Sequence, residues 1–209
     1  MKKIIFATLL LLLSIAAHAD TETRRPTGDG IASGTWAISP ASPANKYSHV
    51  SETARDDSAF IYNSVAGYTC FTYIAFTIPT NAVNIVFKIY FTGGLNTAST
   101  NKLGVFLYVN STEYGIADSL QSLTPSFQQF SYTVATNPDT GSAWLPADLN
   151  GTGSNPLTQF GVYANASTTY PSTSWVYAEV TYELPTTPTA TPSSAKRKRA
   201  FNRSFWWGW

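Results

Sequence analysis

The segment Val83-Asn84-Ile85-Val86-Phe87-Lys88-Ile89-Tyr90-Phe91 alternates between apolar and polar side chains and decides the fold class. Every odd-numbered position holds Val, Ile or Phe, whereas Asn84, Lys88 and Tyr90 stand at even-numbered positions. Successive side chains of a β-strand point to opposite faces, so one face of this segment is expected in a core and the other in solvent. The segment therefore predicts a strand within a half-buried sheet.

The same two-residue period recurs along the chain, and turns rich in Gly, Pro and Asn separate the segments that show it. These segments are 47–51, 70–78, 103–109, 130–134, 160–164 and 176–184. Turn clusters such as Thr92-Gly93-Gly94 and 137–141 lie between them, and 146–149 is expected to form one helical turn. About eight short strands with such turns predict an all-β protein, a single β-sandwich or jelly roll of mainly antiparallel strands.

The N-terminal residues have the pattern of an export signal. Lys2 and Lys3 precede an apolar run over 4–17, and Ala17-His18-Ala19 places small residues around a cleavage position. This arrangement is typical of a secretory signal peptide. We expect residues 1–19 to be removed, the protein to be secreted to the extracellular space or cell surface, and the β-sandwich domain to span 20–184.

The C-terminal residues differ in composition from this domain. Residues 185–195 are rich in Pro, Thr and Ser, so we expect a disordered linker there and a disordered tail at 196–209. The tail holds the surface-attachment candidates Lys196, Arg197, Lys198, Arg199, Trp206, Trp207 and Trp209. Cations approach anionic headgroups and Trp partitions into the headgroup region, so an anionic cell-envelope surface is a candidate partner. A solvated terminus or a sorting signal is the alternative.

The sequence contains few residues and motifs that are typical of catalytic sites. Beyond the signal peptide His49 is the only histidine, and no nucleophile elbow, zinc motif or phosphate-binding loop is present. The single cysteine, Cys70, lies in an apolar run and is predicted to be a buried, inert thiol. We therefore expect no catalytic residues, no enzyme and no nucleic-acid partner. A glycosidase stays open in which Asp56 or Asp57 combines with Glu52, Asp29 or Glu179, because adjacent residues of an extended chain point opposite ways and do not flank one bond.

Aromatic residues are abundant, with 12 Phe, 12 Tyr and 6 Trp. Because Trp and Tyr rings form stacking platforms for sugars, six of them are glycan-binding candidates: Trp36, Trp144, Tyr163, Tyr170, Trp175 and Tyr177. Packing between the sheets of a sandwich explains the same rings equally well.

Four aspartates lie in oxygen-rich turns and are candidate calcium ligands: Asp29, Asp56, Asp57 and Asp148. Calcium prefers hard oxygen ligands from carboxylates and loop carbonyls. None of these turns has the spacing of an EF-hand loop, and Asx turns or loop caps account for the same residues. Calcium is the one cofactor that the sequence suggests.

A set of motifs stands in a fixed order between residues 26 and 184. They are Pro26-Thr27-Gly28-Asp29-Gly30, Trp36, Asp56-Asp57-Ser58 within 52–61, Trp144 with Asp148-Leu149-Asn150, Phe160-Gly161-Val162 and Val176-Tyr177-Ala178-Glu179-Val180. In these motifs the chain resembles an uncharacterised jelly-roll-like β-sandwich module of secreted bacterial and phage-related surface proteins. The resemblance implies a jelly-roll-like fold in a surface setting, and it assigns no catalytic or ligand-binding residues.

Two functions are compatible with these observations. The first is a secreted, non-catalytic surface or structural β-sandwich module that contacts proteins or the cell surface. The alternative is a carbohydrate-binding module with an aromatic stacking platform. The expected partner is an extracellular protein in the first case and a glycan in the second.

Overall fold

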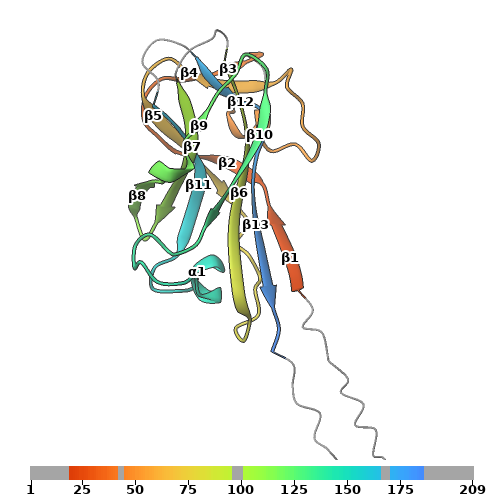
Figure 1. The fold of residues 1–209 in the computed structure, drawn as a ribbon, viewed down its shortest axis with the longest axis vertical. Coiled ribbons are helices and arrows are strands. Elements are labelled where there is room, and N and C mark those ends of the chain that lie inside the picture. The colour runs from red at the N-terminus through yellow and green to blue at the C-terminus, as the bar shows by residue number, and fades with distance from the viewer. Residues whose placement is uncertain (1–18, 42–44, 96–100, 166–169, 186–209) are drawn as a thin grey trace, which may run out of the picture.

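The computed structural model describes residues 19–41, 45–95, 101–165 and 170–185. These residues form two sheets of antiparallel strands that pack into a sandwich (Figure 1). Helical structure within these ranges is limited to α1 (Pro146–Leu149) and the 3₁₀ turns η1 (Tyr47–His49) and η2 (Ala117–Ser119). The predicted all-β sandwich of mainly antiparallel strands is confirmed, as is the helical turn at 146–149.

The first sheet is built around the long strand β6 (Val83–Leu95). Its order is β1 (Ala19–Arg24), β13 (Val176–Glu183), β6, β12 (Pro171–Thr173), β4 (Phe60–Asn63) and β3 (Trp36–Ser39), with β10 (Gln128–Val134) also paired to β6. Both β13 and β10 pair with 87–91, so they lie on opposite sides of β6. β12 pairs with the C-terminal end of β6 and connects it to β4 and β3.

The second sheet lies across the core from the first. Its order is β2 (Pro26–Ala32), β5 (Gly67–Tyr73), β11 (Leu157–Ala164), β7 (Lys102–Val109) and β8 (Thr112–Gly115), with β9 (Gln121–Ser122) also paired to β7. The segments predicted at 103–109 and 160–164 are the central strands of this sheet.

In β6, alternate side chains point into the core and toward the outer face of the first sheet. Phe87, Ile89 and Phe91 are fully buried, and they face the buried residues of β13 in register. Trp144 packs edge-on against Phe87, and its indole N–H donates to the backbone oxygen of Val134 at 2.9 Å. Buried Tyr and Trp usually find such a partner for their polar atom. Trp144 is therefore a core residue.

Three parts of the sequence prediction are wrong. β5 ends at Tyr73, and 74–78 form no strand: Ile74 is 69% exposed, whereas Phe76 and Ile78 reach back into the core from a loop. The apparent period at 70–78 thus joins the end of a strand to a loop. At the start of β6, Val83 is 44% exposed, where the pairing with β13 shifts register.

The third error concerns 47–51, where a strand was predicted and η1 is found. The carboxylate of Asp29 in β2 accepts hydrogen bonds from the backbone N–H groups of Lys46 and Tyr47. This tertiary contact stabilises a turn where the chain enters η1. A local alternation of side chains carries no information about such a distant partner.

The first and last strands among the described residues pair with each other. β1 begins at Ala19, which pairs with Glu183, and the described residues end at 185. The signal peptide (except Ala19), nearly all of the linker and the tail lie outside the described residues, so these boundaries stay predictions. No helix among the described residues is long and apolar enough to cross a membrane.

We predict that truncating side chains on the two faces of β6 lowers the free energy of unfolding by different amounts. Ile89→Ala removes a fully buried side chain and is expected to lower the free energy of unfolding by about 2–5 kcal/mol. Val86→Ala, on the same strand but 43% exposed, is the matched control and should cost less than about 1 kcal/mol. Urea denaturation measures both, and equal losses would contradict this assignment of faces.

Candidate functional site

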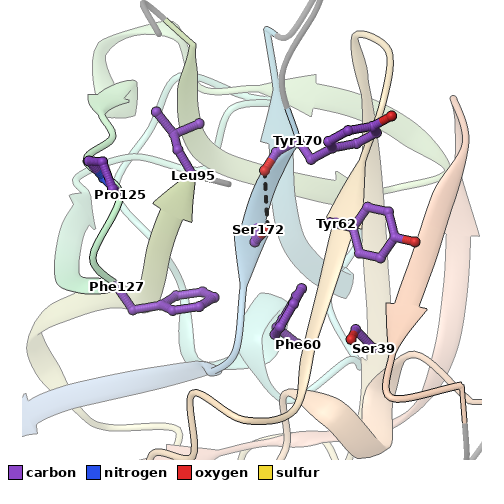
Figure 2. A pocket seen from close by; sticks show the side chains of 8 residues that line it. All are labelled: Ser39, Phe60, Tyr62, Leu95, Pro125, Phe127, Tyr170 and Ser172. Carbon is purple, nitrogen blue, oxygen red and sulfur yellow. Dashed lines mark hydrogen bonds between the residues drawn. The ribbon is translucent and has the colours of Figure 1, made fainter. Parts of the chain in front are cut away.

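A groove of about 510 Å³ lies on the outer face of the first sheet, near the end that holds β3, β4 and β12. Figure 2 shows the side chains that line it. We call it the aromatic groove, and its lining residues are Ser39, Phe60, Tyr62, Leu95, Pro125, Phe127, Tyr170 and Ser172. Pockets of 300–1,000 Å³ are the usual size for small-ligand sites.

Strand register brings five of these residues together, from β3, β4, β6 and β12. Ser39 of β3 pairs with Phe60 of β4, and Tyr62 of β4 pairs with Ser172 of β12. Directly paired residues project from the same face of a sheet, as do residues two apart in one strand. Phe60, Tyr62 and Ser172 therefore share the outer face, while Ile61 between the two rings is fully buried on the inner face.

The opposite wall comes from the segment that leads into β10. Phe127 lies over Gly94 of β6, and a Cβ at position 94 would stand only 3.1 Å from the ring of Phe127. Real Cβ atoms rarely approach a neighbour that closely, so glycine lets the ring lie directly against the sheet. The backbone of Thr124 also accepts a hydrogen bond from the N–H of Leu95 at 2.9 Å.

The four aromatic rings of the groove form a cleft. The ring centroids of Phe60 and Phe127 are 5.6 Å apart with planes inclined by 51°, and those of Phe60 and Tyr62 are 6.1 Å apart at 55°. Tyr62 and Tyr170 meet edge to face at 5.6 Å and 90°. Because the rings are mutually tilted, no single flat surface touches all of them. The arrangement suits a ligand that enters between rings.

Polar atoms in the groove belong to uncharged groups. The hydroxyl of Ser172 donates to the backbone oxygen of Tyr170 at 3.1 Å, which ties the segment before β12 to the strand (Figure 2). The hydroxyls of Tyr62, Tyr170 and Ser39 are the other side-chain polar groups in the lining. None of the described residues that line the groove carries a charged side chain. Hydrogen bonding, and not ion pairing, is the available polar recognition.

An ion pair beside the groove positions Phe127. The Arg55 guanidinium binds the carboxylate of Asp57 through two nitrogen atoms, and it also donates to the backbone oxygen of Phe127 at 2.6 Å. Hydrogen bonding from Arg55 lowers the pKa of Asp57, which favours the ionised carboxylate. The pair thus connects the loop before β4 to the wall of the groove.

The same carboxylate is anchored to the sheet. Ser174, between β12 and β13, donates its hydroxyl to Asp57 at 2.6 Å and lies 2.9 Å from the hydroxyl of Thr92 in β6. Exposed ion pairs add little to stability, typically about 0–1 kcal/mol. We therefore interpret the Arg55–Asp57 pair as a contact that orders residues 124–127, the segment that forms this wall of the groove.

Of the six predicted glycan-binding residues, Tyr170 alone lines the groove, and it is 44% exposed. Trp144 is buried in the core and is not available to a ligand. Trp36 is half-buried on β3 and packs against the core. Tyr163 lies on the second sheet, where its ring meets Phe106 edge-on.

Trp175 and Tyr177 form a second aromatic cluster on the outer face of the first sheet. Tyr177 stacks on Tyr90 of β6 with parallel planes 4.5 Å apart between centroids, and the Arg25 guanidinium lies 5.1 Å from the Tyr177 ring and 5.3 Å from that of Trp175. The Trp175 indole N–H and Arg25 both donate to the backbone oxygen of Glu52. These rings cover one another and hold the loop that starts at Glu52 against the sheet.

Each of the four predicted calcium ligands has a protein partner. Asp29 caps the entry to η1, and Asp56 accepts the N–H of Ser58 at 2.8 Å in an Asx turn. Asp57 binds Arg55, and buried Asp148 accepts from the side chain of Asn137. The described ranges contain no group of three or more His, Cys, Asp or Glu residues that could hold a metal ion. Calcium binding stays a prediction.

His49 and Cys70 are both buried among the described residues. His49 is buried in η1, away from the groove lining. Cys70 is fully buried, as predicted, and burial raises the pKa of its thiol. All seven surface-attachment candidates, from Lys196 to Trp209, lie outside the described residues.

Comparison with known proteins yields remote likenesses. No family model matches the sequence, and neither does any curated protein. The C-terminal CBM6 of LamC, a marine laminarinase from Zobellia galactanivorans, is 12% identical with a TM-score of 0.40, over 78% of this chain and 99% of that one. The CBM22-1 xylan-binding domain of Paenibacillus barcinonensis Xyn10C is 10% identical with a TM-score of 0.45, over 82% and 99%.

A family 35 carbohydrate binding module from Clostridium thermocellum is also similar, at 10% identity and a TM-score of 0.37, over 77% of this chain and 97% of that one. At these identities and scores, none of the three assigns a ligand to this chain.

Sequence reasoning missed most of the groove. Phe60-Ile61-Tyr62-Asn63 does alternate aromatic residues with residues that are buried, but four residues are too few for a period to stand out. Phe127 lies outside any strand, and its place over Gly94 depends on the pairing of β10 with β6.

We predict that Arg55→Ala loosens the groove wall without unfolding the protein. The amides of 124–128 should exchange with deuterium faster, because the bond to the Phe127 oxygen is lost, while global stability changes by no more than about 1 kcal/mol. Hydrogen–deuterium exchange with mass spectrometry measures this. Arg24→Ala, which breaks an ion pair with Glu22 on β1, is the control. Unchanged exchange at 124–128 would show that Arg55 does not position this segment.

Proposed function

We propose that this protein is a non-catalytic module that binds a glycan in the aromatic groove. The observation that carries the proposal is a groove of ligand size with four aromatic rings and only uncharged polar groups in its lining. This favours the carbohydrate-binding alternative over the surface or structural module that the sequence alone suggested first.

The chemistry of the groove matches that of a neutral sugar. Sugar rings have faces of C–H groups that pack on aromatic faces, and hydroxyls around their edges that both donate and accept hydrogen bonds. Phe60 and Phe127 supply apolar ring surface, and the hydroxyls of Tyr62 and Tyr170 both donate and accept. Pockets with apolar walls and a few placed polar groups are typical of small-ligand recognition.

The tilt of the rings restricts which physical form of glycan can bind. A flat crystalline polysaccharide would need coplanar rings to make several stacking contacts at once, whereas the groove rings are inclined by 51–90°. We therefore favour a soluble chain or a chain end, which fits between the rings. The export signal expected at 1–19 would bring the groove to extracellular glycans, and the tail at 196–209 stays a proposal for surface attachment.

The test is a glycan array followed by calorimetry on the purified protein. We expect one class of neutral oligosaccharide to bind and Tyr170→Ala to weaken binding about tenfold, because an exposed aromatic contact is lost. Tyr163→Ala, which removes a half-buried tyrosine of the second sheet, is the matched control and should leave the affinity unchanged. Binding that is lost equally in both variants, or no binding to any glycan, would refute the proposal.

Glycan binding is expected to persist after treatment with EDTA. No carboxylate lines the groove among the described residues, so a divalent cation has no charged side-chain ligand there. Calorimetry with EDTA and with added calcium measures the difference. An affinity that falls with EDTA and recovers with calcium would instead support the calcium prediction.

A further inference from the structure

β10 is the outermost strand on its side of β6 in the first sheet. β13 occupies the opposite side of the same residues of β6, and no other strand in the described ranges pairs with β10. The pairing of β10 with β6 runs without a register shift from Gln128, opposite Gly93, to Val134, opposite Phe87. A regular edge strand of this kind has a row of N–H and C=O groups that a further strand can pair with.

The other edges of the two sheets are protected, and β10 is not. Sheets usually discourage pairing with other chains through charged residues, proline, short length or irregular register. β1 carries Asp20, Glu22 and Arg24, β3 is a four-residue strand that Pro40 follows, β8 also has four residues, and the pairing of β2 shifts register twice. β10 has seven residues, with no charged residue and no proline.

We infer that two copies of the chain pair through β10, antiparallel and with a two-fold axis at Ser131, so that their first sheets join into one. In this register Phe130 stands opposite Tyr132 of the second copy on the inner face, and Gln129 stands opposite Thr133 on the outer face. Aromatic pairs and uncharged polar pairs are favourable cross-strand neighbours.

The strand sequence and the burial pattern both suit a second copy as the partner. β10 carries no charged side chain, so its pairing with a second copy of itself meets no like-charge repulsion. Phe130 and Tyr132 are half-buried at the rim of the core, and a neighbouring strand would cover more of their surface. The edge is therefore uncharged and self-complementary in side-chain type.

Pairing of this kind would give a divalent glycan-binding surface, a consequence that rests on the proposed function. A two-fold axis perpendicular to the joined sheet places both aromatic grooves on the same side of it. Phe127 lies four residues before Ser131, so the two copies of Phe127 would be about 27 Å apart along the strand direction. One extended glycan, or two neighbouring chains, then engages both grooves with a gain in avidity.

Disulfide cross-linking of the full chain tests the pairing and its register. At the two-fold axis, opposed Cα atoms are about 4.5–5.5 Å apart, within the range that a disulfide spans. Ser131→Cys is expected to give a covalent dimer on mild oxidation. Thr133→Cys is the matched control on the same face. Its two copies would be about 14 Å apart along the strands, so this variant should not form a covalent dimer. Cys70 is fully buried, so the introduced thiol is the reactive one.

Sedimentation velocity supplies the second measurement. The unmodified chain is expected to sediment as a dimer, Ser131→Lys as a monomer because two ammonium groups would then face each other, and Ser142→Lys, in an exposed turn, as a dimer. A monomer at every concentration of the unmodified chain, or equal cross-linking at positions 131 and 133, would overturn the inference. Neither residue lines the aromatic groove, so glycan binding by a monomer would leave the proposed function standing.

Discussion

The alternation of side chains in β6 is the constraint on which the rest of the structure depends. β6 pairs with β13 and β10 on its two sides and with β12 at its end, so its register sets the register of the whole first sheet. Because the side-chain period is two, a slip by one residue would turn Phe87, Ile89 and Phe91 outward. Burial of these three side chains therefore fixes which residues the outer face displays.

The aromatic groove is a consequence of that register and of two small residues. Gly94 and Ser172 are paired neighbours on the outer face, and they leave a low floor between the taller rings on either side. The Arg55–Asp57 pair then holds Phe127 above this floor from a loop on another part of the chain. The strands supply the floor and the rings of Phe60 and Tyr62, and the segments before β10 and β12 supply Phe127 and Tyr170. Rigid strands combined with loop residues are common in binding sites.

The fold class was predictable because it depends on local patterns. Long segments such as 83–91, 103–109 and 176–184 show the two-residue period clearly, and they lie in central strands except for Leu184, which follows the end of β13. Short strands such as β4 and β12 do not show it, since three or four residues are too few. The strand predicted at 47–51 was wrong because Asp29, distant in sequence, dictates the turn there.

By itself, the sequence determined an all-β sandwich, a buried Cys70 and the inward face of β6, because apolar periodicity and burial follow from the local order of residues. Tertiary structure alone decided which aromatic residues meet. It buried Trp144, paired Tyr177 with Tyr90, and brought Phe60, Tyr62, Phe127 and Tyr170 into one groove. The physical reason is that a binding groove is made by pairing between distant strands, and each strand's own sequence specifies its faces but not its neighbours.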